Sequence, residues 1–372
     1  MAIIDLDSHL RDGWFLDEIY KLDGPFADET PKRIGDGTLY YSKFKHNLGP
    51  EIDPGAVASF KTPVSHTVFY DPKAKRRDGE IVKWQQGGYD MEYRLKDNAR
   101  ENIDMQFIFP TQIDLAAQTP GALGVAACQA YNNWVHGLVE GHRDRLFPVA
   151  MCPTRNPDAM AGELRRCASE LGFKAAHLSS YTPEHTMDDS AFDPFYAVAQ
   201  ELDIPLFCHP GTFGDKGTLI NRFGHFLPIH VLGRPLNSVA ALMAVVLGGV
   251  FERFPRLKVV FFECTAEFLM FWMHRMDDDY EILKDEGFAP GLNAFPSEYV
   301  RRNCYITCES DEKMLPLALQ EIGESHVCMA TDYPHFDSTF PNTFTGISER
   351  PDLTHRQKTM ILEENSAQLL GL

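Results

Sequence analysis

The chain has 372 residues, of which 44% are hydrophobic and 24% are charged, a composition typical of a globular enzyme with a sizeable core. Its 53 acidic and 35 basic residues give a net charge of −18, which argues against nucleic acid or an anionic membrane as the main partner. No apolar run reaches the length needed to span a membrane, and the N-terminus leads directly into a predicted strand rather than a signal peptide. We therefore expect a cytoplasmic protein.

The eight cysteines stand mostly inside apolar, strand-like runs. No two form the CxxC pair of a zinc ribbon, and Cys304 and Cys308 are too far apart for a redox CxxC motif. We interpret them as reduced, buried thiols.

Eight short apolar runs predict buried β-strands, at residues 2–7, 103–110, 146–153, 173–180, 204–210, 257–264, 304–310 and 327–333. The segments between them have helical spacing, most clearly at 157–172 and 235–254. Runs that are continuously apolar rather than alternating are typical of a parallel sheet covered on both faces. Eight such units predict an α/β fold, a (β/α)8 TIM barrel forming a single domain over residues 1–372. A doubly wound open sheet is the alternative.

The stretch between the first and second predicted strands, roughly residues 10–100, is too long for one crossover connection. It is rich in glycine, proline, tyrosine and aspartate. Because it follows the carboxyl end of the first strand, we expect it to be an insertion that caps the mouth of the barrel.

Histidines and carboxylates stand at the carboxyl ends of five of the eight predicted strands, the edge where such barrels build their active sites. Asp7 and His9 end the first strand, and their spacing of two places both side chains on one face. The other strand-end residues are His209, Glu263, Glu309, Asp332 and His335. A buried carboxylate beside a buried imidazole costs desolvation energy unless something pairs them, and a metal ion is one such partner.

Each of these residues also has a structural interpretation, since Asp or His at a strand end often caps a helix or a loop. We favour metal ligation for Asp7, His9, His209 and Asp332. Glu263 could instead serve as a first-turn acid of the following helix, and His335 could only line the pocket.

Other polar residues near the strand ends are given weaker roles. We expect Glu309 to be a capping or supporting group and His177 to be a satisfied core residue. His225 and His230, in the predicted loop after the fifth strand, could reach a substrate.

On the stretches IDLDSH, DIPLFCHPG, KVVFFE and ATDYPHFDST, together with others over nearly the whole chain, the sequence resembles the amidohydrolase-related family. The branch is the one often called amidohydrolase-2, which includes metal-dependent decarboxylases. The resemblance implies a distorted (β/α)8 barrel with a divalent metal in its mouth. The family's HxH or ExH metal motif matches Asp7 and His9, and its strand-5 His and strand-8 Asp match His209 and Asp332.

Two departures from the decarboxylase pattern point to a different branch. Where the decarboxylases carry a histidine at the end of strand 6 this chain has Glu263, and His335 is an additional histidine after strand 8. The chain thereby resembles a DxDxH branch of the family that contains oxygenases with dinuclear iron or iron–manganese centres. We predict a six-residue metal site (Asp7, His9, His209, Glu263, Asp332, His335), with Glu263, Asp332 and His335 as the catalytic groups.

Four functions on a small organic substrate remain open from the sequence. The leading prediction is an O2-dependent monooxygenase (hydroxylase) with two Fe or Fe/Mn ions and electrons from a reductase or ferredoxin. The alternatives are a non-oxidative decarboxylase using one Mn or Zn, a metal-dependent hydrolase with Asp332 accepting a proton, and a non-catalytic metal-binding partner subunit. We also expect a homodimer or a complex with a related barrel subunit.

Overall fold

The computed structural model describes residues 2–12, 15–34, 39–41, 86–111, 113–210, 226–287, 291–335 and 337–372. Most of the predicted insertion lies outside these residues. Its described parts include α1 (Leu16–Ile19), the 3₁₀ helices η2 (Gly24–Glu29) and η4 (Gln86–Gly88), the hairpin β3 (Lys32–Ile34) with β4 (Leu39–Tyr41), and α4 (Met91–Asn98). The capping role of residues 10–100 therefore stays a prediction.

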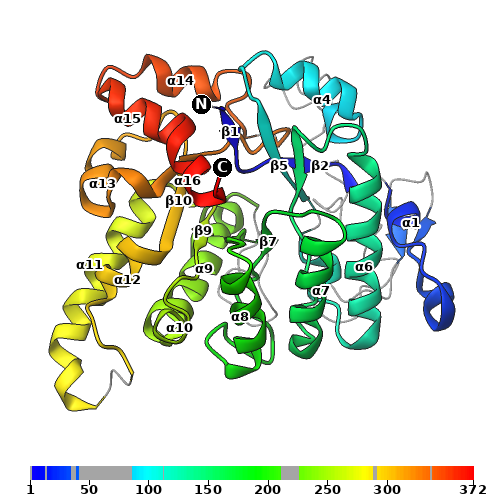
Figure 1. The fold of residues 1–372 in the computed structure, drawn as a ribbon, viewed down its shortest axis with the longest axis horizontal. Helices are drawn as coiled ribbons and strands as arrows, with labels where there is room; N and C mark the ends of the chain where they lie inside the picture. Colours follow the sequence, from blue (N-terminus) through cyan, green and yellow to red (C-terminus); the bar gives the residue numbers. More distant parts are fainter. Residues whose placement is uncertain are drawn as a thin grey trace.

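All eight predicted strand segments are strands in the structure, and they surround one central axis (Figure 1). The first is split into β1 (Ile4–Asp5) and β2 (His9–Leu10), both paired with β5. The others are β5 (Met105–Pro110), β6 (Leu146–Pro148), β7 (Ala176–His177), β8 (Leu206–Cys208), β9 (Val259–Phe261), β10 (Cys304–Cys308) and β11 (Val327–Met329). Every pairing described between these strands is parallel, as the continuous apolar runs predict.

Two seams join the two parallel sheets into a ring. At one seam Ala150, just after β6, forms a parallel bridge with Ala176 of β7. At the other, Leu6 N donates to Met329 O at 3.3 Å, and Ser8 forms a parallel bridge with Tyr333. An open sheet has no such second seam, so the predicted (β/α)8 barrel is confirmed.

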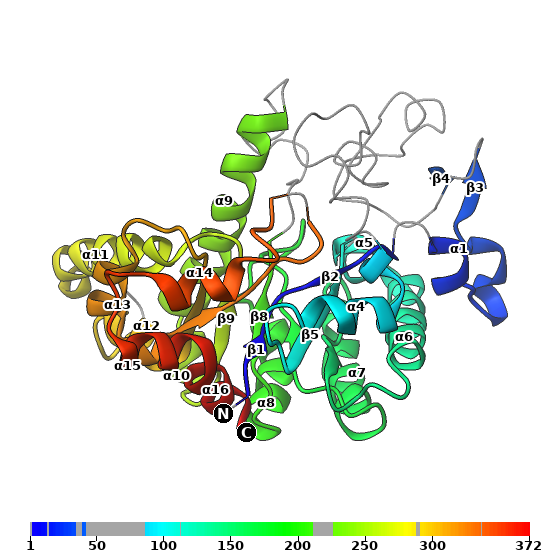
Figure 2. The same ribbon diagram turned by 90° about the horizontal axis from the view of Figure 1, so that it is seen from above.

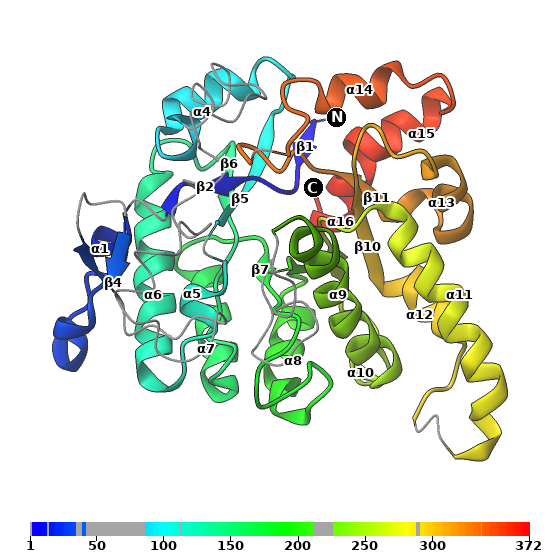
Figure 3. The same ribbon diagram turned by 180° about the vertical axis from the view of Figure 1, so that it is seen from behind.

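Helices cover the outside of the barrel (Figures 2 and 3). They include α5 (Ile113–Ala117), α6 (Gly121–Leu138), α7 (Pro157–Ser169), α8 (Asp193–Glu201), α9 (Phe226–Leu247), α10 (Val250–Arg253), α11 (Ala266–Leu283), α12 (Pro296–Asn303), α13 (Leu315–Ile322) and α14 (Thr343–Glu349). In α7, Pro157 occupies the first turn, and the buried Met160, Leu164 and Cys167 recur at helical spacing. That apolar stripe is what the sequence pattern predicts for a helix packed on a barrel.

Helix α9 differs from its prediction. It begins at Phe226 rather than near Pro235, which lies inside the helix, and it ends at Leu247 before Gly249 adopts φ 71°. His230 is therefore a helical residue and does not lie in a loop, whereas His225 lies outside the described residues.

The stretch His230–Leu247 of α9 is long and apolar enough to cross a membrane by composition, with a mean hydropathy of 1.4. This differs from the sequence expectation that no run reaches that length. Within the barrel α9 packs against α10 and α12, and 44% of this stretch is buried. A helix that covers a barrel wall meets the same compositional criterion, so the finding is weak evidence for a membrane span.

The C-terminal helical stretch packs on its own barrel. It consists of α15 (His355–Thr359), a π-helical turn (Met360–Glu364) and α16 (Asn365–Leu370), with Ile361, Leu362 and Leu369 buried. Asn365 Nδ2 donates to Val327 O at 2.7 Å, which ties this segment to β11.

Aromatic side chains fill the barrel interior just below the strand ends. Phe207 packs against Phe109 and Phe262 at ring distances of 6.0 and 5.0 Å, and Phe109 lies 4.9 Å from the ring of His209. The cysteines, all of which lie in the described part of the chain, are buried and free, as expected. The strand-end polar groups thus stand on an apolar floor.

Candidate metal centre

Backbone hydrogen bonds between the first and last strands bring the predicted ligands together. Asp332 N donates to Asp7 O at 3.0 Å, and His9 N donates to Tyr333 O at 2.6 Å. Because these bonds fix the register of the two strand ends, Asp7, His9 and Asp332 are adjacent although they lie at opposite ends of the sequence.

The imidazoles of His9 and His209 present their Nε2 atoms to the same point. His9 Nδ1 is 3.2 Å from Pro110 O, and His209 Nδ1 is 3.2 Å from Pro210 O, so the Nδ1 atoms are engaged by backbone carbonyls. The two Nε2 atoms are 3.1 Å apart. A histidine whose outer nitrogen donates to a carbonyl is the form that binds metals, with its tautomer fixed by that bond.

Carboxylates surround this pair of nitrogens. His9 Nε2 is 3.2 Å from Asp7 Oδ1 and 3.3 Å from Asp332 Oδ1. His209 Nε2 is 3.4 Å from Asp7 Oδ2 and 3.9 Å from Glu263 Oε1. Nitrogen and oxygen donors from four strand ends therefore converge at one buried point.

His335 completes the set. Its Nδ1 is 2.6 Å from Asp332 Oδ1 and 3.9 Å from Glu263 Oε1, and its Nε2 is 3.2 Å from Thr111 Oγ1. The structure thus brings all six predicted residues together. They form two overlapping groups whose ligand atoms lie within 4.8 Å of one another: Asp7, His9, His209 and Glu263, and His9, Glu263, Asp332 and His335.

The donor set fits a divalent cation. Asp7 Oδ1, Glu263 Oε1 and Asp332 Oδ1 are buried, and none accepts a hydrogen bond within the described part of the chain. Buried carboxylate oxygens are costly without a hydrogen bond or a cation. Mixed imidazole and carboxylate ligands suit Mn, Fe or Zn.

The pKa values of Asp7 and the histidines reflect the proximity of unlike charges. Burial acts to raise the pKa of Asp7, but His209 and His9 outweigh it and hold the pKa well below its usual range. Burial acts to lower the pKa of His209, but Asp7 and Glu263 outweigh it and raise the pKa to about 9. Burial, together with the neighbouring His335, lowers the pKa of His9 to about 3. Metal-free, His209 carries the proton that a cation would replace.

The other two carboxyls show the opposite effect. Burial raises the pKa of Glu263 to about 7 against the influence of Arg234. Burial, with Asp337 and Asp7 nearby, raises the pKa of Asp332 well above its usual value. More acids are gathered here than the side-chain cations can neutralise, and a bound dication would relieve that repulsion.

The backbone is strained where these carboxylates are presented. Glu263, Thr265 and Asp332 have φ values of 54°, 64° and 53°. Residues other than glycine rarely adopt such angles, and when they do they cluster at functional sites. The end of β9 and the end of β11 both carry this feature.

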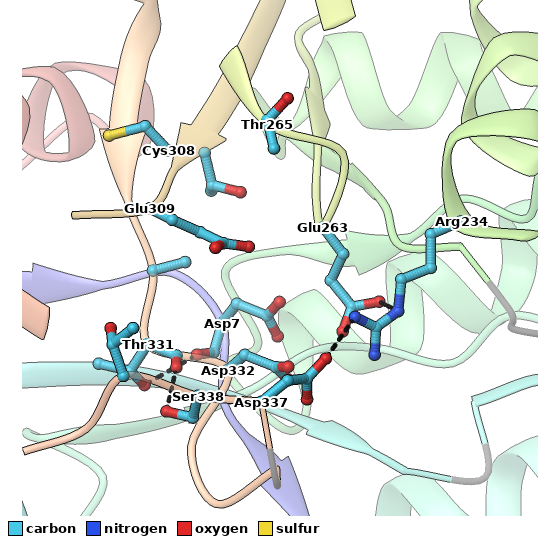
Figure 4. A pocket seen from close by; sticks show the side chains of 13 residues that line it. Asp7, Arg234, Glu263, Thr265, Cys308, Glu309, Thr331, Asp332, Asp337 and Ser338 are labelled. Carbon is cyan, nitrogen blue, oxygen red and sulfur yellow. Dashed lines mark hydrogen bonds and ion pairs between the residues drawn. The ribbon is translucent and has the colours of Figure 1, made fainter. Parts of the chain in front are cut away.

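A pocket opens beside the cluster (Figure 4). Its described lining consists of Asp7, Arg234, Glu263, Thr265, Thr307, Cys308, Glu309, Ala330, Thr331, Asp332, Asp337, Ser338 and Thr339. The sequence analysis missed Arg234 and Asp337. Asp337 lies within the quoted stretch ATDYPHFDST, a signal that could have identified it, whereas Arg234 has no such spacing signal.

The other residues predicted near the strand ends do not belong to the six-residue cluster. Glu309 lines the pocket, and the capping role expected of it belongs to Glu312, whose carboxylate accepts from Glu309 N and Ala266 N at 2.7 and 3.0 Å. His177 is buried, as expected, and its Nε2 lies 3.3 Å from His209 O. His230 Nε2 lies 3.2 Å from Asp337 Oδ2.

A closed barrel with histidines and carboxylates converging at the carboxyl ends of its strands defines a metal-dependent (β/α)8-barrel enzyme. The chain belongs to the amidohydrolase family, whose model matches residues 65–372.

Comparison with known proteins agrees with this family. A 2-amino-3-carboxymuconate-6-semialdehyde decarboxylase from Dictyostelium discoideum is 25% identical over 288 residues, covering 76% of this chain and 77% of that protein. The structure of 5-carboxyvanillate decarboxylase from Sphingomonas paucimobilis matches with a TM-score of 0.75 and 20% identity, over 100% of this chain and 99% of that one. A dihydroxybenzoic acid decarboxylase from Polaromonas, solved with manganese and the inhibitor 2-nitroresorcinol, matches with a TM-score of 0.70 and 18% identity, over 100% and 97%.

Proposed function

We propose that the protein is a metal-dependent carboxy-lyase that removes CO2 from a small aromatic or unsaturated carboxylic acid. The observation that carries the proposal is the buried pair of His9 and His209 Nε2 atoms, 3.1 Å apart and surrounded by carboxylates at the barrel mouth. Decarboxylases among the relatives, one of them solved with manganese, support this function over the predicted monooxygenase. One manganese ion is the cofactor we favour, with zinc as the alternative.

In this proposal Asp7, His9, His209 and Glu263 hold the cation, since they form one of the two groups of converging donors. When bound, the cation supplies positive charge to the substrate carboxylate and to the carbanion that develops as CO2 leaves. The reaction converts R–COO⁻ and H⁺ into R–H and CO2, so a proton must reach the carbon.

Asp332 is the group we assign as proton donor. Burial and the nearby Asp337 and Asp7 raise its pKa well above its usual value, which favours the protonated form that a proton donor needs. His335 Nδ1, 2.6 Å from Asp332 Oδ1, is placed to return the proton after each turnover.

The second candidate is the dinuclear Fe or Fe/Mn monooxygenase. It is favoured by the second group of donors, His9, Glu263, Asp332 and His335, which shares two residues with the first. Asp7, Glu263 and Asp332 would offset the charge of two dications in a low-dielectric site. This function would require a reductase or ferredoxin as electron donor.

One experiment separates the two candidates. The protein is loaded with Mn²⁺ or with Fe²⁺, and metal per chain, CO2 release and O2 uptake are measured on 2,6-dihydroxybenzoate, 5-carboxyvanillate and related hydroxybenzoates. We expect one metal per chain and CO2 release that is equal with and without O2. Two metals per chain, with substrate hydroxylation only when O2 and a reductant are present, would reverse the assignment.

A further inference from the structure

Arg234, on α9, links Glu263 of the metal centre to Asp337, another residue that lines the pocket. Its Nε lies 2.9 Å from Glu263 Oε2, and its Nη1 lies 2.8 Å from Asp337 Oδ2 (Figure 4). The side chains of Arg234 and Glu263 are only 14% and 6% exposed. Within the described lining of the pocket, Arg234 is the sole lysine or arginine.

Glu263 therefore presents its two oxygens to different groups. Oε2 is engaged by the guanidinium of Arg234. Oε1 is buried, accepts no hydrogen bond among the described residues, and is 3.9 Å from both His209 Nε2 and His335 Nδ1. A carboxylate that pairs one oxygen with a guanidinium presents the other oxygen to a cation, and this arrangement favours ligation through one oxygen over chelation through both.

The guanidinium is itself fixed from the outer side. His230 and Arg234 are one turn apart on α9, and His230 Nε2 lies 3.2 Å from the same Asp337 Oδ2 that Arg234 contacts. Asp337 is held between the two side chains, so the orientation of the guanidinium plane is set by α9 and by the segment after β11 together.

We propose that Arg234 is a positioning residue of the metal centre: by holding Glu263 Oε2 it directs Oε1 alone to the cation. The inference rests on the proposed metal-dependent function and assigns how one ligand of that site is oriented. Arg234 also offsets the charge of an additional carboxylate beside Asp7 and Asp332. Without it, Glu263 would be free to rotate, to chelate through both oxygens, or to leave the cation.

The test is a titration of metal-free protein with Mn²⁺, followed by electron paramagnetic resonance. Arg234→Met should weaken Mn²⁺ binding by about 10- to 100-fold, the usual effect of removing a partner that orients a metal ligand. The spectrum of the bound ion should also change, because the number of carboxylate oxygens around it changes. Arg234→Lys retains the charge but cannot span both acids, so it should restore affinity only in part.

A double-mutant cycle shows whether Arg234 acts through Glu263. In a Glu263→Gln background, Arg234→Met should have less than about a twofold further effect on Mn²⁺ affinity, because the group it orients is already altered. Arg253→Met is the matched control: Arg253 also joins an acid, Asp193, at 3.0 Å, but it lies on α10 and outside the described lining of the pocket. This variant should bind Mn²⁺ as the wild type does.

The possible outcomes distinguish the proposed metal-dependent function from the positioning role of Arg234. If the wild type binds no Mn²⁺, the proposed function fails. If it binds Mn²⁺ and both Arg234 variants leave affinity and spectrum unchanged, the positioning role is overturned while the metal site stands. An equal loss on Arg234→Met in the wild-type and Glu263→Gln backgrounds would likewise overturn it, as it would show that Arg234 acts independently. Should Arg234→Met not fold, Arg234→Lys carries the same cycle.

Discussion

Two buried polar clusters lie next to each other along the first strand, and they differ in how completely they are satisfied. In the inner one, Asp5 accepts hydrogen bonds from Thr331 N, Thr331 Oγ1, Gln106 Nε2 and Asp7 N at 2.6–3.2 Å. Arg94 of α4, also fully buried, donates to Gly87 O, Ser8 Oγ and Gln106 Oε1, and also to His9 O. Within this network each charged group has its partners in the chain.

The outer cluster, two residues further along the strand, is not satisfied in this way. Asp7 Oδ1, Glu263 Oε1 and Asp332 Oδ1 accept no hydrogen bond from the described residues, and two of these residues have left-handed backbone angles. A polar cluster that is complete in itself stabilises a fold, whereas one that is incomplete marks the place where a ligand belongs. A structural network and a functional one therefore lie only two residues apart along the first strand.

The largest expected effect is in the complete network. Arg94→Met removes donors from buried carbonyl and amide oxygens, and we expect the free energy of unfolding to fall by about 3–5 kcal/mol, measured by urea denaturation of the metal-free protein. Arg100→Met, at the exposed end of the same region where Arg100 pairs with Asp97 at 3.6 Å, is the control and should change stability by less than about 0.5 kcal/mol. A similarly small change on Arg94→Met would show that the network is not structural.

The incomplete cluster should be stabilised from outside. Mn²⁺ at about 100 times its dissociation constant should raise the free energy of unfolding by about 2.7 kcal/mol, because it binds only the folded state. His209→Ala should abolish this increase, whereas His274→Ala, which removes an exposed histidine paired with Glu321 at 3.2 Å, should leave it intact. Equal stabilisation of all three proteins would place the metal elsewhere.

The affinity for Mn²⁺ should increase with pH. In the metal-free protein burial lowers the pKa of His209, but Asp7 and Glu263 raise it further, to about 9. At neutral pH the metal must therefore displace a proton, and raising the pH removes that competitor. Between pH 6 and 8 affinity should rise at least about tenfold per pH unit, or about 1.4 kcal/mol, and more steeply below pH 7, where Glu263, whose pKa burial raises to about 7, must also lose a proton. Calorimetry in buffers of different ionisation enthalpy should detect the release of this proton on metal binding. An affinity that does not change with pH, with no proton released, would contradict a protonated His209 in the metal-free protein.

The smallest expected effect has the opposite sign from the first. Burial raises the pKa of Asp332, so above the pKa of the unfolded residue, unfolding releases a proton and wild-type stability falls as pH rises. Asp332→Asn removes this penalty and should stabilise the metal-free protein by about 1 kcal/mol at pH 8, at the expense of turnover. Thermal unfolding of the metal-free variant measures the gain in stability, and an activity assay with metal measures the loss of turnover. A loss of stability in Asp332→Asn would place Asp332 in the structural network instead.

Features that depend on local pattern were predictable from sequence. The apolar runs gave all eight strand positions, and the two-residue spacing of Asp7 and His9 placed both on the site. The role of Arg234 was not predictable, because it depends on where α9 begins and on tertiary contacts with Glu263 and Asp337.

The choice between reactions was less predictable still. The structure brings the six predicted residues together, and their role as metal ligands stays a prediction. Sites with one metal and sites with two metals use the same residue types and differ in the distances between donors. The sequence analysis favoured the monooxygenase because Glu263 replaces the strand-6 histidine, because His335 is additional, and because the chain resembles the DxDxH branch. The relatives that the chain matches are named as decarboxylases.

The seam between the first strand and the last has a consequence for how the protein is made. Thr331 Oγ1 donates to Asp7 O across 324 residues of chain, so Asp7 and His9 are synthesised early but acquire Asp332 and Tyr333 as neighbours only when β11 has docked. Contacts between segments so distant in sequence are formed slowly, and chains in synthesis fold from the N-terminal side first. The proposed proton donor, Asp332, therefore joins the proposed metal ligands only in a finished ring, so the turnover per chain that our proposal expects would count the molecules that have completed assembly.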